Sequence, residues 1–148
     1  MKQKISKADI VRTQINRACE CHLAGDFISS LTLGGSAESL SSELVKSRRC
    51  LSPNFWAKPA NFWHQKFIRF WRERKGMQSS SNQDINNEIN WARNSVKHHN
   101  PGYPEALKIN LELESFLVIQ SAIENYQRLK EIRTKQMVNF FEGTREYG

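Results

Sequence analysis

The amino-acid sequence predicts an all-α protein, a bundle of about four to six helices, and three observations lead to this fold class. Apolar residues recur three or four positions apart along several segments, which is the spacing of one helix face. No segment of useful length alternates apolar and polar residues with a period of two, so no sheet is predicted. Glycine, proline and helix-capping residues separate the periodic segments. Helices that each bury one apolar stripe pack against one another, so we expect a bundle.

Length and composition indicate a single globular domain over residues 1–148. No apolar run approaches the roughly eighteen residues that a membrane-spanning helix needs, so we expect no membrane partner. The basic N-terminus is followed by no apolar stretch, which argues against a signal peptide. The three cysteines, with Cys19 and Cys21 almost adjacent, indicate reduced thiols and therefore a cytoplasmic protein.

The first two helices are expected over residues 7–24 and 27–47. Gly25 can end the first helix in a left-handed conformation, and Asp26 can cap the second. The glycine pair at 34–35 falls inside the second helix, where each glycine costs roughly 1 kcal/mol relative to alanine. We therefore expect another helix to approach closely there. The candidate core residues of the two helices are Ile10, Val11, Ile15, Ala18, Cys19, Leu23, Ile28, Leu31, Leu40 and Leu44.

Residues 48–82 differ from the rest of the chain, and we interpret them as a basic, aromatic insert in the bundle. Two prolines interrupt the helical spacing in 48–62, which indicates a loop or a short helical turn. A third helix is expected over 62–75, ended by Gly76.

The positive charge of the chain is concentrated in this region. Residues 42–76 carry nine lysines and arginines against two acidic residues, whereas residues 1–41 and 77–148 are nearly balanced. Aromatic residues interleave with these charges, which is typical of a surface that binds phosphates and unstacked bases. An alternative is a helix whose aromatic residues are core and whose charges face solvent. The residues expected to bind RNA here are Lys66, Arg69 and Arg72.

The fourth helix is expected over about 84–98, with Ser81 or Asn82 as its cap. Pro101 pushes the residue before it out of the α region, so the helix should stop near His99. Its apolar face is formed by Ile85, Ile89, Ala92 and Val96.

A turn signal at 100–104 precedes a fifth helix over about 105–133, whose length leaves open a break near 110–113. A last short helix is expected over 134–142. The candidate core residues of these helices are Leu107, Leu111, Phe116, Leu117, Ile119, Ala122, Ile123, Tyr126, Leu129, Met137, Phe140 and Phe141.

The end of the fourth helix combines groups that suit phosphodiester chemistry. Arg93 supplies a cation that can hold two phosphate oxygens. His98, or His99, supplies an imidazole that can give or take a proton near neutral pH. On a continuous helix Arg93 and His98 would lie about 140° apart around the axis. A joint site therefore requires the helix to end near His98, or a second subunit to complete the site.

Several stretches of the chain resemble the HEPN superfamily. Residues 93–98, Arg-Asn-Ser-Val-Lys-His, match its Arg-x4-6-His signature, with a polar residue directly after the arginine. Residues 25–38 are similar to the second helix of small bacterial members, and residues 122–129 are similar to their last long helix.

The resemblance extends over about residues 20–47 and 84–130, and the chain departs from the family in two places. Asn100 stands where the subgroup paired with nucleotidyltransferase antitoxins has a tyrosine. The insert at 48–82 has no counterpart that we recognise in the family, so it can be this protein's own substrate or partner surface.

The resemblance implies a HEPN-like bundle, usually a homodimer, and in many members a metal-independent endoribonuclease of toxin–antitoxin or antiphage defence systems. Such an enzyme needs no cofactor, because single-stranded RNA supplies its own nucleophile, the ribose 2′-hydroxyl. We expect His98 to transfer protons, with His99 as second choice. Arg93 would stabilise the phosphorane, Asn94 would orient the histidine or the phosphate, and Lys97 would bind RNA.

One histidine cannot easily make both proton transfers, and a two-fold dimer that brings two motifs together solves this. The expected partners are therefore RNA, a second copy of the chain, and an antitoxin or other defence-system protein.

Other interpretations stay open. Arg93 can instead form a salt bridge to Glu38 or Glu88, and His98 can serve only as a helix C-cap. Glu38 can also support the site from behind, or be a surface carboxylate. The whole protein can be a non-catalytic HEPN-like module that binds RNA or a protein partner, which predicts salt-dependent binding without cleavage.

Cys19-Glu20-Cys21-His22 invites a metal site, but the spacing argues against one. Thiols two positions apart on a helix point about 200° away from each other, and no second ligand pair follows at the spacing of a zinc finger. We expect no metal.

Overall fold

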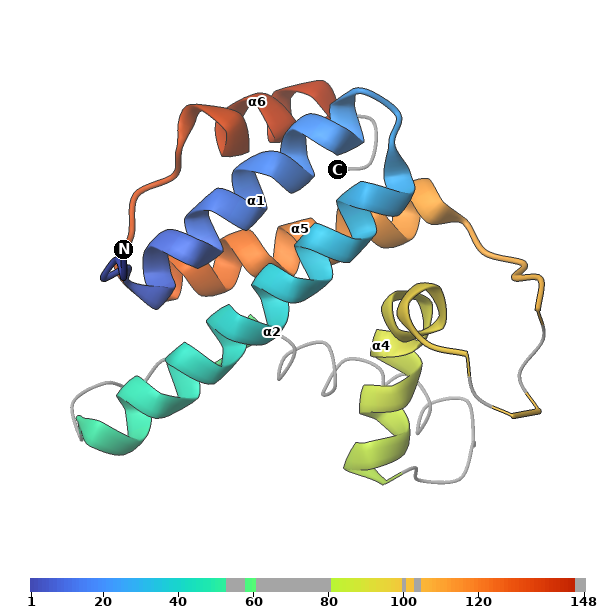
Figure 1. Ribbon diagram of the computed structural model, residues 1–148, viewed down its shortest axis with the longest axis horizontal. Coiled ribbons are helices and arrows are strands. Elements are labelled where there is room, and N and C mark those ends of the chain that lie inside the picture. The colour runs from blue at the N-terminus through green and yellow to red at the C-terminus, as the bar shows by residue number, and fades with distance from the viewer. Residues whose placement is uncertain (53–57, 61–80, 100, 103–104, 146–148) are drawn as a thin grey trace.

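Helices are the regular elements of this protein. The computed structural model describes residues 1–52, 58–60, 81–99, 101–102 and 105–145, and no strand occurs in that part of the chain (Figure 1). The all-α prediction is confirmed, whereas the helix expected over 62–75 lies outside the described residues. The described helices are α1 (Lys7–Leu23), α2 (Phe27–Leu51), α4 (Asn82–Lys97), α5 (Leu111–Arg128) and α6 (Lys135–Gly143).

Capping residues set the helix starts that the sequence predicts. Asp26 accepts the Ser29 N–H at the start of α2 (3.1 Å), and Gly25 just before it has φ +81°, a left-handed value that glycine adopts without strain. Ser81 and Asp84 form a reciprocal capping box at the start of α4. These local signals explain why the starts of α2 and α4 fall within two residues of the prediction.

The predicted boundaries of two helices are wrong. α2 continues to Leu51, so residues 48–51 belong to this helix and not to a loop. α5 covers only Leu111–Arg128 of the predicted 105–133, because Asn110 caps its start by accepting the Leu113 N–H (3.1 Å). The break near 110–113 is therefore present.

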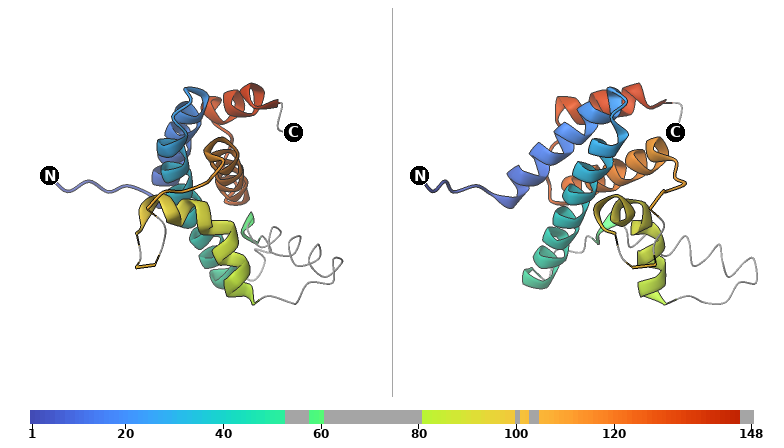
Figure 2. Two further views of the ribbon diagram at one scale, coloured as in Figure 1. Left: turned by 90° about the vertical axis from the view of Figure 1, so that its right-hand side faces the viewer. Right: turned by 45° about the vertical axis from the view of Figure 1, so that its right-hand side comes forward.

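Helices α1 and α2 run antiparallel and are joined by two hydrogen bonds. Ser30 Oγ donates to the Ala18 carbonyl oxygen, and Gln14 Nε2 donates to Ser36 Oγ, both at 3.0 Å. Residue numbers of the bonded partners increase along α2 while they decrease along α1, which shows that the two helices are antiparallel. Both helices pack on α5, and α6 packs along α1 (Figure 2).

Helices α2 and α5 run parallel, with the glycine pair at their closest approach. A Cβ added to Gly34 would lie 2.9 Å from Val118 Cγ1 and 3.1 Å from Ile119 Cγ1. Further along, Arg48 Nη1 donates to the Leu129 carbonyl oxygen (2.6 Å). The prediction that a helix approaches the glycines closely is confirmed.

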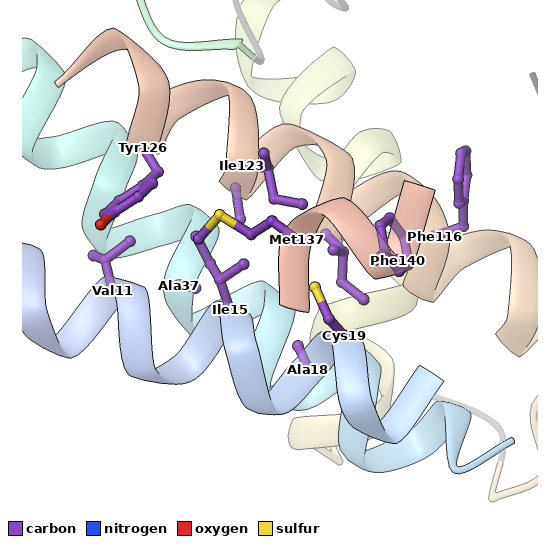
Figure 3. Packing of buried hydrophobic residues seen from close by; sticks show 12 residues of the cluster. Val11, Ile15, Ala18, Cys19, Ala37, Phe116, Ile123, Tyr126, Met137 and Phe140 are labelled. Atoms are coloured by element: carbon purple, nitrogen blue, oxygen red, sulfur yellow. The ribbon is translucent and has the colours of Figure 1, made fainter. Parts of the chain in front are cut away.

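The hydrophobic core lies between α1, α2, α5 and α6 (Figure 3). The prediction that Leu117 is a core residue is wrong, because Leu117 is 39% exposed and lies on the opposite face of α5 from the buried residues. The same prediction is wrong for Ile28, which is 59% exposed, and for Leu23, which is 47% exposed. Ile28 lies at the margin of the buried stripe of α2, which is made largely of small residues. The core consists of Val11, Ile15, Ala18, Cys19, Ala37, Phe116, Ile119, Ala122, Ile123, Tyr126, Met137 and Phe140.

Helix α4 lies to one side of this core, against α2 and α5 (Figures 1 and 2). Ile85 is fully buried and Ala92 is 3% exposed, so these two residues of the predicted apolar face pack against the bundle. None of the described helices is long and apolar enough to cross a membrane.

Candidate functional site

The candidate site lies where α4 ends. Lys97 is the last helical residue, and His98 is the C-cap, with extended backbone angles (φ −130°, ψ 139°). The His98 N–H donates to the Asn94 carbonyl oxygen (2.9 Å), which closes the last turn. The sequence predicts a helix that stops near this motif, and the structure places the stop at Lys97, just before the two histidines.

Arg93 is held against α2 by a buried ion pair. Its Nη1 donates to Glu38 Oε2 (2.5 Å) and to the Gly35 carbonyl oxygen (3.2 Å). The Arg93 side chain is 12% exposed and that of Glu38 is 8% exposed. Of the interpretations that the sequence leaves open, the structure thus forms the salt bridge to Glu38.

Gly35 makes room for this arginine. A Cβ at position 35 would collide with Cδ and Cγ of Arg93, so the aliphatic part of the arginine lies directly on the backbone of α2. Removing one partner of a buried pair leaves the other charge without compensation, which typically costs about 3–5 kcal/mol. Arg93 and Glu38 are therefore the polar tie between α4 and α2.

An open pocket of about 250 Å³ lies at the end of α4. Its lining includes a lysine, two histidines and a glutamate, which come from two segments, residues 95–99 and 105–107. Burial, and then the positive charge of Arg93, lower the pKa of Lys97 below its ordinary value. The lining residues are Ser95, Val96, Lys97, His98, His99, Glu105 and Leu107.

The structure thus groups the predicted site residues unevenly. Lys97, His98 and His99 share the pocket, whereas Arg93 is not among its lining residues and faces α2. Asn94 is exposed on the last turn of α4. The other predicted RNA-binding residues, Lys66, Arg69 and Arg72, lie outside the described residues.

Sequence reasoning missed Glu105 as a pocket residue. The one signal for it is the turn at 100–104, because a chain that reverses after α4 returns past the end of that helix. Nothing in the sequence says which residue of the returning segment lines the pocket.

Two residues of the predicted insert are part of the bundle. Arg48 is committed to the end of α5 by its hydrogen bond to the Leu129 carbonyl oxygen. The Ala60 N–H donates to the buried Asn125 Oδ1 (2.7 Å), so the described residues 58–60 are attached to α5. These contacts leave the rest of the insert as a prediction.

Two residues of the Cys-x-Cys-His stretch of α1 point into the interior of the bundle. Cys19 and His22 are buried, and His22 Nδ1 lies 2.7 Å from Ser115 Oγ. Among the described residues, no group of three or more histidine, cysteine or acidic side chains is placed to hold a metal ion.

No protein-family model matches the sequence, and no curated protein or solved structure matches it.

Proposed function

We propose that this protein is a metal-independent endoribonuclease with a HEPN-like bundle, acting on single-stranded RNA in a toxin–antitoxin or antiphage defence setting. The observation that carries the proposal is the pocket at the end of α4, which collects Lys97, His98 and His99. The match of residues 93–98 to the Arg-x4-6-His signature supports the same function.

RNA cleavage needs proton-transfer groups and a cation, and residues of both kinds line this pocket. One imidazole accepts the proton of the ribose 2′-hydroxyl, whose oxygen then attacks the adjacent phosphorus. The ammonium group of Lys97 attracts the phosphate and stabilises the charge that builds up on its oxygens. The 5′-oxygen leaves with a proton from a protonated imidazole, and the products end in a 2′,3′-cyclic phosphate and a 5′-hydroxyl. No step needs a metal ion or a cofactor.

Arg93 supports this site from outside the pocket, where it is bound to α2. The ion pair with Glu38 fixes the last turns of α4, and therefore the position of the residues that follow. Burial is the main cause of the lowered pKa of Lys97, and the positive charge of Arg93 adds to it. A phosphate contact by Arg93 uses the part of the guanidinium that Glu38 and Gly35 leave free.

The test is cleavage of single-stranded RNA in the presence of EDTA. The wild type should cut and leave 2′,3′-cyclic phosphate ends, and His98→Ala should cut at least about 100-fold more slowly, the typical share of a proton-transfer group. Arg93→Lys, which keeps a cation opposite Glu38, separates loss of the guanidinium from loss of the α4 attachment. Gln127→Ala, an exposed position on α5, is the matched control and should match the wild type.

Two outcomes would contradict the proposal. If EDTA abolishes cleavage, the metal-free mechanism is wrong. If His98→Ala and Arg93→Lys both cut at the wild-type rate, the assignment of the site is wrong.

A second candidate is a non-catalytic module that binds RNA or a protein partner. The observation that favours it is the burial of Arg93, since an arginine that is 12% exposed and bound to Glu38 serves the fold first. This candidate predicts RNA binding that weakens steeply with salt while the RNA stays intact. Binding by the wild type without any cleavage product would select it.

A further inference from the structure

We propose that a single chain supplies both proton-transfer groups of the reaction, with His98 and His99 acting as a pair in one pocket. The proposal rests on the ribonuclease function proposed above and deepens it. From the sequence alone, the two histidines are alternative candidates for one role, and the second imidazole is expected from another subunit. The pocket changes this requirement, because both histidines of the same chain line it.

The local backbone explains how neighbouring residues can play different parts. His98 has left the helix and is extended, with φ −130° and ψ 139°. Successive side chains of an extended segment leave the backbone in opposite directions. The side chains of His98 and His99 therefore leave the backbone in different directions, and both residues line the pocket.

Cleavage through the 2′-hydroxyl benefits from this arrangement. The bond from the 2′-oxygen to phosphorus forms on one side of the phosphate, and the bond from phosphorus to the 5′-oxygen breaks on the other. The neutral imidazole takes the proton from the 2′-hydroxyl, and the protonated imidazole gives its proton to the departing 5′-oxygen. The pair thus exchanges protonation states in one step, and no further reactant is needed.

The pocket has the size for this ligand, and its charged lining residues are Lys97, which attracts a phosphate, and Glu105, which opposes it. About 250 Å³ accommodates a phosphate with parts of its neighbouring riboses, and Lys97 on the same wall supplies positive charge. The last turn of α4 is fixed by the Arg93–Glu38 pair. The backbone that carries both histidines is therefore positioned by contacts within the same chain.

The experiment is a mixing assay with His98→Ala and His99→Ala. Each variant alone should lose at least about 100-fold in cleavage rate, because each removes one proton-transfer group. An equimolar mixture, unfolded and refolded together so that any subunits can exchange, should stay as inactive as the separate variants. Melting curves for both variants, compared with Gln127→Ala, show that the loss is not due to unfolding.

The outcomes separate this proposal from the one that it rests on. If His99→Ala keeps the wild-type rate, His99 has no catalytic part and the pairing is wrong, although the enzyme stands. If the mixture regains a quarter or more of the wild-type activity, the two histidines act across subunits and the proposal is overturned. If the wild type does not cut RNA at all, the ribonuclease function itself fails.

Discussion

His22 is a titratable side chain inside the hydrophobic core. The centroid of its ring lies 5.1 Å from that of Phe27 and 5.2 Å from that of Phe140. Its Nδ1 lies 2.7 Å from Ser115 Oγ, and the residue is 5% exposed. Burial lowers the pKa of His22 below the ordinary value of 6.5, and the charge of Glu112 opposes this to a smaller extent. The core therefore holds the neutral imidazole.

This burial predicts a loss of stability in mild acid. Because the pKa of His22 is lower in the folded state, the unfolded state takes up the proton first as the pH falls below about 6.5. We expect the free energy of unfolding to fall between pH 7 and pH 5.5 by at most about 1 kcal/mol from this residue, the limit set by protonation of the unfolded state. Urea denaturation at both pH values measures it.

His22→Gln is the control for this prediction. It removes the titration but keeps a polar group opposite Ser115, so its stability should change less over the same pH interval. The comparison also cancels Glu114, whose pKa is raised by burial and which acts in the opposite sense. Equal pH dependence in the two proteins would show that His22 does not titrate as proposed.

The connection between α5 and α6 holds an unfavourable backbone conformation. Leu129 is the C-cap of α5, and Lys130, which follows it, has φ +63°. A side chain in this left-handed region costs roughly 1–2 kcal/mol, whereas glycine adopts it without a clash. The Lys130 side chain is exposed, so it gains little packing in return.

Lys130→Gly should therefore stabilise the protein. The relief of the left-handed strain exceeds the added flexibility of the unfolded chain, and we expect a gain of about 0.5–1 kcal/mol. Thermal unfolding followed by circular dichroism measures the shift. Gln127→Gly, inside the last turn of α5, should instead cost about 1 kcal/mol. A loss of stability in Lys130→Gly would mean that the lysine side chain has a role at this turn.

At the scale of the whole molecule, α4 has the least support among the described helices. The core is built by α1, α2, α5 and α6, whereas α4 rests on the side of α2 and α5 (Figure 2). Within the described part of the chain, Ile85, Ala92 and the Arg93–Glu38 pair attach it to the bundle. The candidate site thus lies on the part of the fold that can open without unfolding the rest.

Native-state hydrogen exchange should detect this difference. Amides of α4 should open with a free energy at least about 1 kcal/mol below that of amides in α1, α2 and α5. Glu38→Gln, which leaves Arg93 without its ion-pair partner, should lower the opening free energy of α4 further and leave α1 unchanged. If α4 exchanges together with α5 in both proteins, the fold opens as one unit and the prediction fails.

The described helices and most of their ends could be predicted from the sequence by itself. Asp26 and Ser81 act on backbone groups within three residues, and Gly25 needs only its own backbone freedom. The chemical inventory of the α4 end could also be predicted, because the helix stop before Pro101 is a local effect. These features can be predicted because each depends on residues that are close together in the sequence.

Tertiary structure alone decided which groups meet. The choice of Glu38 as partner of Arg93 joins residues on different helices, and it depends on α4 lying against Gly35. The separation of Arg93 from the pocket, and the entry of Glu105 into it, depend on how the chain returns after α4. Side-chain spacing along one helix cannot specify such pairs, because they form only when separate helices bury their faces together.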